Sequence, residues 1–541
     1  MRGAKSAKWV VGATVVALAA TACGGGGSDG NSSGKGKGNG VISMEIGEPQ
    51  NTLIPSNTYE TEGGEVVKAL FTGLTQLNEK NEVVNDLAQS ITTKDSKVWT
   101  FKLKSGYTFH NGEAVTAQSF VDAWNYAANQ DNAQQTNPLF SHIEGYRDLN
   151  PGPKKKVTKK EMSGLKAVDA TTLQVTLDAP FSAFTSQLSF SAFMPLPKVF
   201  FDDPKAFGEA PIGNGPYKMS GKFQHNEKIS VVKYDKYPDA SKFEVKGIDF
   251  KIYSNADTSY KDLVAGNLDI QDTIPTSGLA TYKKDLPGRT IDESDSGVGY
   301  IGFPLKYNKE FQNKDLRKAL SMAIDRKTIA EKIFLGSRMP ADDFISPIIE
   351  GYRQGACGDA CTLNPAKAKE LYKKSGGLPN DTLEIGYNAD GDHKGWIEAV
   401  ANQIQQNLGI KVTAKPFEQF QTILNDLDAK KYSGAFRMGW NMDYPNMENY
   451  LRPIFSKDAI ENGSNYAGYT NEKFEQLLKD GDQATTPESA IKKYQEADDV
   501  LLDEMPYIPV YFYKLNAGYS SKIKSMKIAG GDVLWDTVKL S

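Results

Sequence analysis

The side chains best suited to catalysis or metal binding are few and far apart in this sequence. Its histidines are His110, His142, His225 and His393. No two of them have the His-x-x-x-His spacing of a zinc pair, and neither a Gly-x-Ser-x-Gly nucleophile turn nor a Walker loop occurs. Gly213-Asn214-Gly215 is followed by Pro216-Tyr217, which does not fit the pattern of a dinucleotide-binding loop. The sequence therefore favours binding over catalysis, and it predicts neither a metal nor a cofactor.

A cysteine near the N-terminus points to covalent lipidation. A basic start and an apolar run from Trp9 to Ala20 are typical of a secretory signal. As a helix this run reaches about 18 Å, which is too short for the roughly 30 Å hydrocarbon core of a bilayer. Ala20-Thr21-Ala22-Cys23 resembles a bacterial lipobox, so we expect a signal peptide over residues 1–22 and acylation of Cys23. An ordinary signal with an incidental cysteine is the alternative.

The segment after Cys23 has the composition of a flexible leash. Residues 24–40 are rich in glycine and serine and contain nothing apolar, so they cannot bury enough surface to offset their ordering entropy. A coil of about 17 such residues reaches roughly 20–25 Å. We therefore predict that residues 23–40 are a lipid anchor and leash. They would hold an exported body at the outer face of the cytoplasmic membrane, on the cell surface or in the periplasmic space.

The other two cysteines, Cys357 and Cys361, are separated by only three residues. In an exported protein a close, even pair favours a local disulfide. A zinc site would need two more ligands, and no histidine lies nearby in the sequence. We predict a disulfide that fixes a surface loop.

Composition excludes several classes of protein. The net charge is −4, with charges of both signs throughout, which argues against nucleic-acid binding. No other long apolar run occurs after the leash, and the remaining chain is long enough for two or three domains. Aromatic residues make up 10% of the chain, including 25 Tyr and 25 Phe, a supply that suits the lining of a wet binding cleft.

Strand and helix patterns alternate along the chain, which favours an α/β architecture. The expected strands are Val41–Ile46, Val98–His110, Thr171–Leu177, Lys228–Tyr234, Val245–Tyr253, Leu383–Tyr387 and Ile410–Ala414. The expected helices are Glu65–Leu74, a helix with Thr116 as its N-cap, Tyr260–Asn267, Lys314–Ile324, Asp325–Phe334, Trp396–Leu408 and Phe417–Leu427.

Four groups of motifs, in this order, resemble the solute-binding protein family 5 of ABC importers, whose members are peptide-binding lipoproteins and periplasmic proteins. The first is Val98–Gly112 with Val115–Phe120, and the second is Gly213–Tyr217. The third combines Gly266–Ile270, Val298–Tyr300 and Asp315–Leu320, and the fourth is Met438–Pro445. Each motif alone is modest evidence, but their order along the chain makes the resemblance specific.

The resemblance implies an α/β, two-lobed periplasmic-binding-protein-like fold of class II, large type, with an inserted extra domain. The hinge would consist of two chain crossings, at Val298–Tyr300 and Pro509–Phe512. The expected parts are lobe I from residues 41–71, 207–296 and 511–541, an inserted domain II from 72–206, and lobe III from 297–510. Closure of such lobes sequesters a ligand at the domain interface.

The resemblance also implies a ligand site around the fourth motif. The family's oligopeptide binders carry an aspartate at the position of Asp443, where it pairs with the α-ammonium of the ligand. A buried charge without a counter-ion is very costly, so a carboxylate suits this place. Gly439 would allow close approach of the ligand backbone, Trp440 would form an apolar wall, and Arg437 would meet a ligand carboxylate or carbonyl. A solvated Asp443, a Trp440 in the core and an Arg437 ion pair within the lobe are the alternatives.

The remaining candidates for ligand contact come from both lobes. On lobe I, Tyr59, Glu60 and Thr61 fall in the stretch that the family uses to bind the extended ligand backbone. Within this stretch, Glu60-Thr61-Glu62-Gly63 lacks the small apolar residues of well-known oligopeptide binders, which leaves the ligand's length and register open. On lobe III the candidates are Asn441, Phe420 and Tyr300.

The expected function is capture of di- to oligopeptides by a monomer and their delivery to an ABC permease with its ATPase in the same membrane. Main-chain hydrogen bonds and roomy, wet side-chain pockets would make such binding tolerant of sequence. A binder of another solute (an oligosaccharide, an opine or a chelated metal), a receptor for a peptide signal and a secreted hydrolase are the alternatives.

Overall fold

The computed structural model describes residues 40–541, apart from 59, 153–154, 390–392 and 419. The chain forms two units, Met1–Gly38 and Asn39–Ser541, and all elements below belong to the second. The predicted signal peptide, Cys23, the leash up to Asn39 and the candidate ligand residue Tyr59 lie outside the described residues. Within the described part, no helix combines the length and the apolarity that a bilayer crossing requires.

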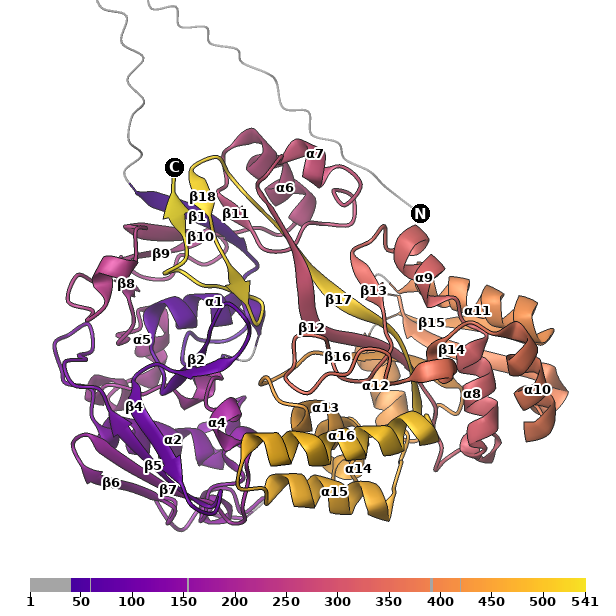
Figure 1. Ribbon diagram of the computed structural model, residues 1–541. Coiled ribbons are helices and arrows are strands. Elements are labelled where there is room, and N and C mark those ends of the chain that lie inside the picture. The colour runs from indigo at the N-terminus through magenta and orange to yellow at the C-terminus, as the bar shows by residue number, and fades with distance from the viewer. Residues whose placement is uncertain (1–39, 59, 153–154, 390–392, 419) are drawn as a thin grey trace, which may run out of the picture. The chain divides into compact units, whose positions relative to one another are not determined.

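One large mixed sheet organises the second unit (Figure 1). Its strand order is β15-β14-β16-β12-β17-β11-β1-β10-β9-β8, and β13 pairs with β17 outside this path. The bounds are β1 Val41–Ile46, β8 Tyr217–Met219, β9 Lys228–Lys233, β10 Gly247–Ile252, β11 Ile270–Gln271, β12 Thr290–Gly302, β13 Arg338–Pro340, β14 Thr382–Asn388, β15 Lys411–Phe417, β16 Ala435–Trp440 and β17 Tyr507–Tyr519.

The strands β12 and β17 connect the two halves of this sheet. Each has 13 residues, and they run side by side and antiparallel (Figure 1). At one end β17 pairs with β11, and at the other β12 pairs with β16. Between the pairs Ser294–Lys514 and Val298–Phe512 the register shifts, which marks a β-bulge.

Smaller sheets and helices surround the large sheet. A separate four-stranded sheet has the order β4-β5-β7-β6, with bounds β4 Ala88–Thr93, β5 Val98–Leu103, β6 Leu165–Asp169 and β7 Thr172–Thr176. Three pairs complete the strands: β2 Thr75–Leu77 with β3 Val83–Asn85, β18 Ile523–Ser525 with β21 Lys539–Leu540, and β19 Ile528–Ala529 with β20 Asp532–Val533. The helices are α1 Thr61–Leu70, α2 Ala117–Ala128, α3 Tyr146–Leu149, α4 Phe184–Gln187, α5 Pro204–Glu209, α6 Ala256–Ala265, α7 Tyr282–Asp285, α8 Lys314–Met322, α9 Arg326–Thr328, α10 Pro365–Ser375, α11 Lys394–Leu408, α12 Phe420–Asp428, α13 Glu448–Phe455, α14 Ala459–Asn462, α15 Glu472–Asp482 and α16 Pro487–Glu504.

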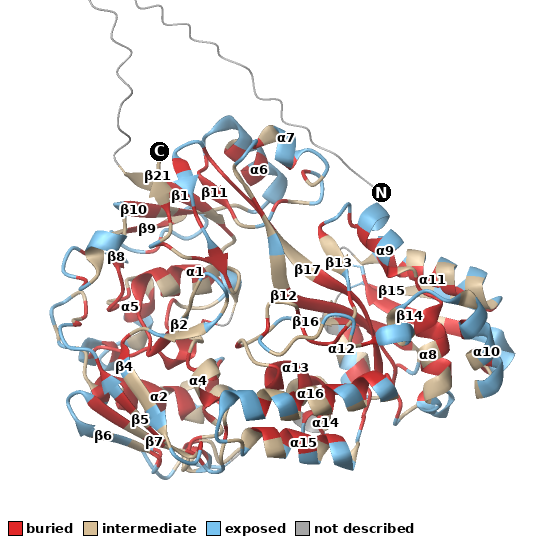
Figure 2. Ribbon diagram, in the orientation of Figure 1, coloured by how far each residue is buried: buried red, intermediate tan, exposed pale blue. Residues whose placement is uncertain are grey.

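The buried apolar residues form two large clusters. One draws on residues 42–291 and 517–538, with Tyr444 as its member from elsewhere, and the other on residues 298–512. A small third cluster lies around α6 and α7. Buried residues, red in Figure 2, fill the Val298–Gly302 half of β12. The residue boundaries of lobes I and III and of domain II stay predictions.

Two expected helices differ from the observed ones for reasons of local chemistry. The helix expected over Glu65–Leu74 is α1, which starts earlier and ends at Leu70, because Phe71 already has an extended backbone. The helix expected over Asp325–Phe334 is split, because only Arg326–Thr328 is α-helical and Ile329–Ile333 forms a π-turn. Thr116 caps α2 as predicted, in a capping box with Ser119.

Two strand ends also differ from the expected ones. The strand expected over Val98–His110 ends at Leu103, because Gly106 adopts a φ of 90° that turns the chain. Phe417 was expected in a helix, but it ends strand β15, and α12 starts at Phe420.

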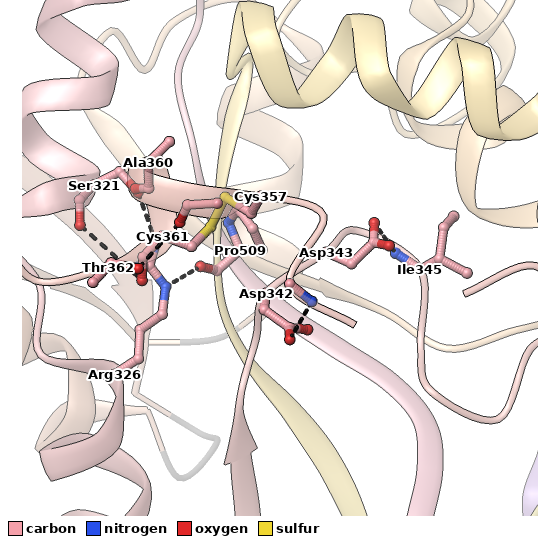
Figure 3. Close-up of a disulfide and its surroundings, with 12 residues drawn as sticks. Ser321, Arg326, Asp342, Asp343, Ile345, Cys357, Ala360, Cys361, Thr362 and Pro509 are labelled. Atoms are coloured by element: carbon pink, nitrogen blue, oxygen red, sulfur yellow. Dashed lines mark hydrogen bonds between the residues drawn. A yellow bond between two sulfur atoms is a disulfide. The ribbon is translucent and has the colours of Figure 1, made fainter. Parts of the chain in front are cut away.

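Cys357 and Cys361 are joined by a disulfide, as their spacing predicts, with Cα atoms 5.5 Å apart. Figure 3 shows Arg326, which is buried, beside it. The guanidinium of Arg326 donates hydrogen bonds of 2.9 Å to the Cys361 carbonyl and 2.8 Å to the Pro509 carbonyl. The disulfide loop is thereby tied to strand β17.

Candidate functional site

Three stretches of chain contribute most of the lining of a cavity of about 230 Å³. One wall follows α1, from Phe71 to Leu77, and a second is the hairpin region Ala529–Asp536. The third wall is Met442–Pro445, just past the end of β16. Asp443, the predicted partner of a ligand ammonium, therefore lines a cavity whose other two walls come from segments outside the large sheet.

The Gly213-Asn214-Gly215 motif holds the first wall in place. The Asn214 side chain is fully buried; it accepts a hydrogen bond of 3.0 Å from the Thr72 amide and donates one of 2.9 Å to the Thr72 carbonyl. The Gly215 amide donates to the Leu70 carbonyl at 2.8 Å. These bonds take the place of the next helical turn, so the chain leaves α1 extended and forms the cavity wall.

The hydrogen bonds of Asn214 and Gly215 form a clamp on the end of α1, and His110, which has no catalytic neighbours, contacts this clamp. Its amide donates to the Gly213 carbonyl at 2.8 Å, and its Nε2 lies 3.1 Å from the Gly215 carbonyl oxygen. Burial lowers the pKa of His110 to about 4, so the ring is neutral at physiological pH. Two of the motifs that carry the family resemblance thus meet to shape the cavity.

Asp443 is held by a side chain that the sequence did not single out. Asn449, in helix α13, is 1% exposed. Its Oδ1 accepts a hydrogen bond of 2.7 Å from the Asp443 amide, and its Nδ2 donates one of 3.1 Å to Asp443 Oδ2. This two-point contact fixes the position of the Asp443 carboxylate on the cavity wall.

The cavity is lined by more acidic than basic side chains. Lys68 pairs with Asp532 on its wall, and Lys242 pairs with Asp239 at 2.9 Å. Burial raises the pKa of Asp86 to about 7; Lys104 opposes this rise, and Asp239 and Asp536 add to it. The lining of this cavity therefore suits a positively charged group of a ligand better than a negatively charged one.

Arg437 lies on β16 and is 8% exposed. Its Nη1 donates a hydrogen bond of 3.1 Å to Asn388 Oδ1, and its guanidinium carbon lies 5.8 Å from the centre of the Phe420 ring. The Nε has no hydrogen-bond partner, and no carboxylate of the described residues forms an ion pair with this guanidinium. An ion pair within the lobe, the alternative role for Arg437, is therefore not observed among the described residues.

Two other candidates of the fourth motif, Gly439 and Trp440, lie on the same strand, and Asn441 follows its end. Gly439 is opposite Gly299 and Trp440 is opposite Val298 in the β16–β12 ladder. Trp440 is half-buried, and its indole N–H has no partner among the described residues. Asn441 is exposed, and its side-chain oxygen lies close to Gly297.

Tyr300 and the lobe I candidates occupy different surroundings. Tyr300 is 1% exposed and stacks on Tyr507 with ring centres 4.8 Å apart, so it lies in the core beside the site. Burial raises the pKa of its hydroxyl. Glu60 is the N-cap residue of α1, where its Oε1 accepts a hydrogen bond of 3.1 Å from the Gln50 amide, and Thr61 is the exposed first residue of the helix. The structure thus brings Arg437, Phe420 and Gly439 together, while Glu60 and Thr61 lie at the far end of α1 from the cavity.

In the described residues no group of three or more His, Cys, Asp or Glu side chains is arranged to hold a metal ion. The site consists of a positioned carboxylate, a buried guanidinium and aromatic walls. These are means of holding a charged organic ligand.

The fold is that of two-lobed periplasmic binding proteins. The MppA periplasmic murein tripeptide-binding protein, in its unliganded open form, matches with a TM-score of 0.80 at 24% identity, over 92% of this chain and 97% of that one. Haemophilus influenzae OppA in complex with the peptide RPPGFSPFR matches with a TM-score of 0.71 at 24% identity, over 92% and 98%. The predicted two-lobed α/β fold is confirmed.

Sequence comparison defines the family. The profile of the bacterial extracellular solute-binding proteins, family 5, matches residues 82–462. The oligopeptide-binding protein OppA of Bacillus subtilis (strain 168) is 30% identical over 490 residues, which cover 87% of each chain. The dipeptide-binding protein DppE of the same strain is 29% identical over 466 residues, covering 82% of this chain and 81% of the relative. The chain therefore belongs to family 5 of the bacterial extracellular solute-binding proteins, as its motifs indicated.

Proposed function

We propose that this protein captures peptides between its two lobes and delivers them to the permease of an ABC importer. The observation that carries the proposal is a carboxylate and a guanidinium of opposite charge, six residues apart on and just past strand β16. Asp443 is positioned by Asn449 on a cavity, and six residues earlier the buried Arg437 has no carboxylate partner among the described residues. A peptide has an ammonium at one end and a carboxylate at the other.

The spacing of these two residues suits short peptides. Six residues of extended chain span at most about 20 Å, and an extended ligand advances roughly 3.3 Å per residue. The path between them crosses Gly439, where a side chain is absent and a ligand backbone can approach the sheet. The peptide-binding relatives OppA and DppE support the same ligand class.

The protein purified from an exporting host is expected to carry a mixture of short peptides, which mass spectrometry after acid release would identify. Unfolding and refolding would remove them. Saturating alanine peptides of two to five residues should then raise the melting temperature by mass action, since a ligand at about 1,000 times Kd stabilises by about 4 kcal/mol. The same peptides should lower the radius of gyration measured by solution scattering, because closure brings the lobes together.

Two results would count against this proposal. A scattering profile that stays the same at saturating peptide contradicts closure, and release of a sugar or a metal chelate in place of peptides favours the non-peptide alternative. Recovery of the added peptides intact after long incubation separates binding from hydrolysis. The forward-scattering intensity should correspond to the mass of one chain, as expected for a monomer.

We also propose that the protein is held at the outer face of the cytoplasmic membrane by a lipid on Cys23. Ala20-Thr21-Ala22-Cys23 and the glycine-rich leash support this anchor. Cys23→Ala is expected to move the protein from the membrane pellet to the soluble or secreted fraction. Retention of the variant in the pellet, at wild-type level, would remove the main support for lipidation.

A further inference from the structure

A second arginine lies on the same face of the sheet as Arg437 and has no role in the site described so far. Arg338 opens the short strand β13 and is opposite Tyr513 of β17. Its guanidinium carbon lies 4.2 Å from the centre of the Tyr513 ring and 5.5 Å from that of Phe334. Stacking of this kind holds the guanidinium plane and leaves its edge available for a planar anion.

The strand registers place the two arginines in one row. Residues directly opposite in neighbouring strands share a face, as do residues two apart within a strand. Gly439 is opposite Gly299, and Gly299 is opposite Tyr511. The row therefore runs from Arg437 across the two glycines to the tyrosines of β17, and on to Arg338.

Distances across the row show how close the two cations come. A Cβ at Gly439 would lie 3.7 Å from Arg437 Nη2 and 3.9 Å from the Tyr513 hydroxyl. Since Arg338 stacks on that same Tyr513 ring, the two guanidinium groups are separated by little more than one tyrosine side chain. The Tyr511 hydroxyl, 3.4 Å from that of Tyr513, adds a further hydrogen-bonding group between them.

Neither cation is neutralised by an ion pair among the described residues. Arg338 donates a hydrogen bond of 2.7 Å to the Ser337 carbonyl, but its Nε, like that of Arg437, has no partner. Asp295 is near enough for the charge of Arg338 to oppose the rise that burial causes in its pKa, yet the two form no ion pair. Two partly buried guanidinium groups without counter-ions imply that an anion completes the row.

We propose that this row binds two negative charges at the carboxyl end of a peptide, so that peptides ending in Glu or Asp are the preferred class. Arg437 takes one carboxylate and Arg338 takes the other, on opposite sides of Tyr513. The inference rests on the proposed capture of peptides. It adds a specificity-determining residue, Arg338, and a class of ligand.

The test compares matched peptides by isothermal titration. Alanine peptides of two to five residues are made in two series, ending either in Glu or in its neutral isostere Gln. Wild type should bind the Glu series at least about tenfold more tightly at the best length, which corresponds to about 1.4 kcal/mol. Arg338→Gln should remove this preference and leave the affinity for the Gln series within about twofold, and Arg338→Lys should restore part of the preference.

Lys514 provides a matched control on the same strand. It neighbours Tyr513, but its side chain is on the opposite face, where it pairs with Asp292. Lys514→Gln removes one positive charge and should leave the Glu preference unchanged. The role of Arg338 is overturned if wild type binds both series equally, a result that does not depend on the folding of any variant. It is also overturned if the preference for Glu survives in Arg338→Gln. Failure of wild type to bind either series refutes peptide capture itself.

Discussion

Asp443→Asn is expected to weaken the binding of free peptides by about two to three powers of ten. A closed, water-poor cleft leaves the ligand's ammonium without its counter-ion in this variant, and loss of one half of such a pair costs about 3–5 kcal/mol. The asparagine keeps both hydrogen-bonding positions used by Asn449, so the loop geometry is retained. Isothermal titration with refolded protein measures the loss.

A double-mutant cycle assigns this loss to the ammonium. N-acetylation of the peptide should weaken binding to wild type by a similar factor and have a much smaller effect on Asp443→Asn, because both changes remove the same interaction. The melting temperature of the empty variant should stay within a few degrees of wild type. Equal binding of acetylated and free peptides to wild type would falsify the assignment of Asp443 to the amine.

Gly213→Ala is expected to destabilise the fold by about 3 kcal/mol or more, one of the larger effects of a single methyl group. A Cβ at this position would lie 1.9 Å from the carbonyl oxygen of Leu70, a backbone atom at the end of α1 that cannot move without breaking the Asn214 clamp. Thermal unfolding followed by circular dichroism should show a melting temperature lower by at least about 5 °C.

Gly64, within helix α1, offers the matched control. A Cβ there meets no atom within 4 Å, and its backbone has no positive φ. Gly64→Ala should therefore stabilise the protein by up to about 1 kcal/mol, since alanine loses less backbone freedom in a helix. If both variants melt at the wild-type temperature, Gly213 is not held against α1 as described.

The elements with strong local patterns were predictable from the sequence. The strand Val41–Ile46 has the predicted bounds, and the paired strands β9 and β10 are off by one or two residues. The end of α1 was not predictable, because it is set by Asn214, which is 142 residues away from Thr72 in the chain. The full length of β12 was also missed, since its Asp, Ser and Gly residues have low strand propensity and are held by pairing with β17.

In the candidate site, too, residues within one continuous motif were predictable from the sequence, and residues outside it were not. Motif 439–443 is continuous, so resemblance sufficed to single out Gly439, Trp440 and Asp443. Asn449 lies on the next helix and Arg338 is about 100 positions upstream, and neither belongs to a motif with a recognisable spacing. Asn449 reaches Asp443 through the turn that leads into α13, whereas Arg338 reaches its row only through the pairing of β13 with β17.

The bulge in β12 connects the predicted hinge crossing at Val298–Tyr300 with the proposed ligand site. Three residues, Asp295–Gly297, stand opposite Tyr513 alone, and the Tyr450 hydroxyl donates a hydrogen bond of 2.6 Å to the Ser296 carbonyl. Tyr450 is the neighbour of Asn449, which holds Asp443. The bulge lies next to the hinge crossing predicted at Val298–Tyr300, so this crossing and the proposed amine site share one set of contacts. We expect occupancy of the amine site to act on this crossing directly through these contacts, so substitutions between Asp443 and Tyr450 should change affinity and opening rate together.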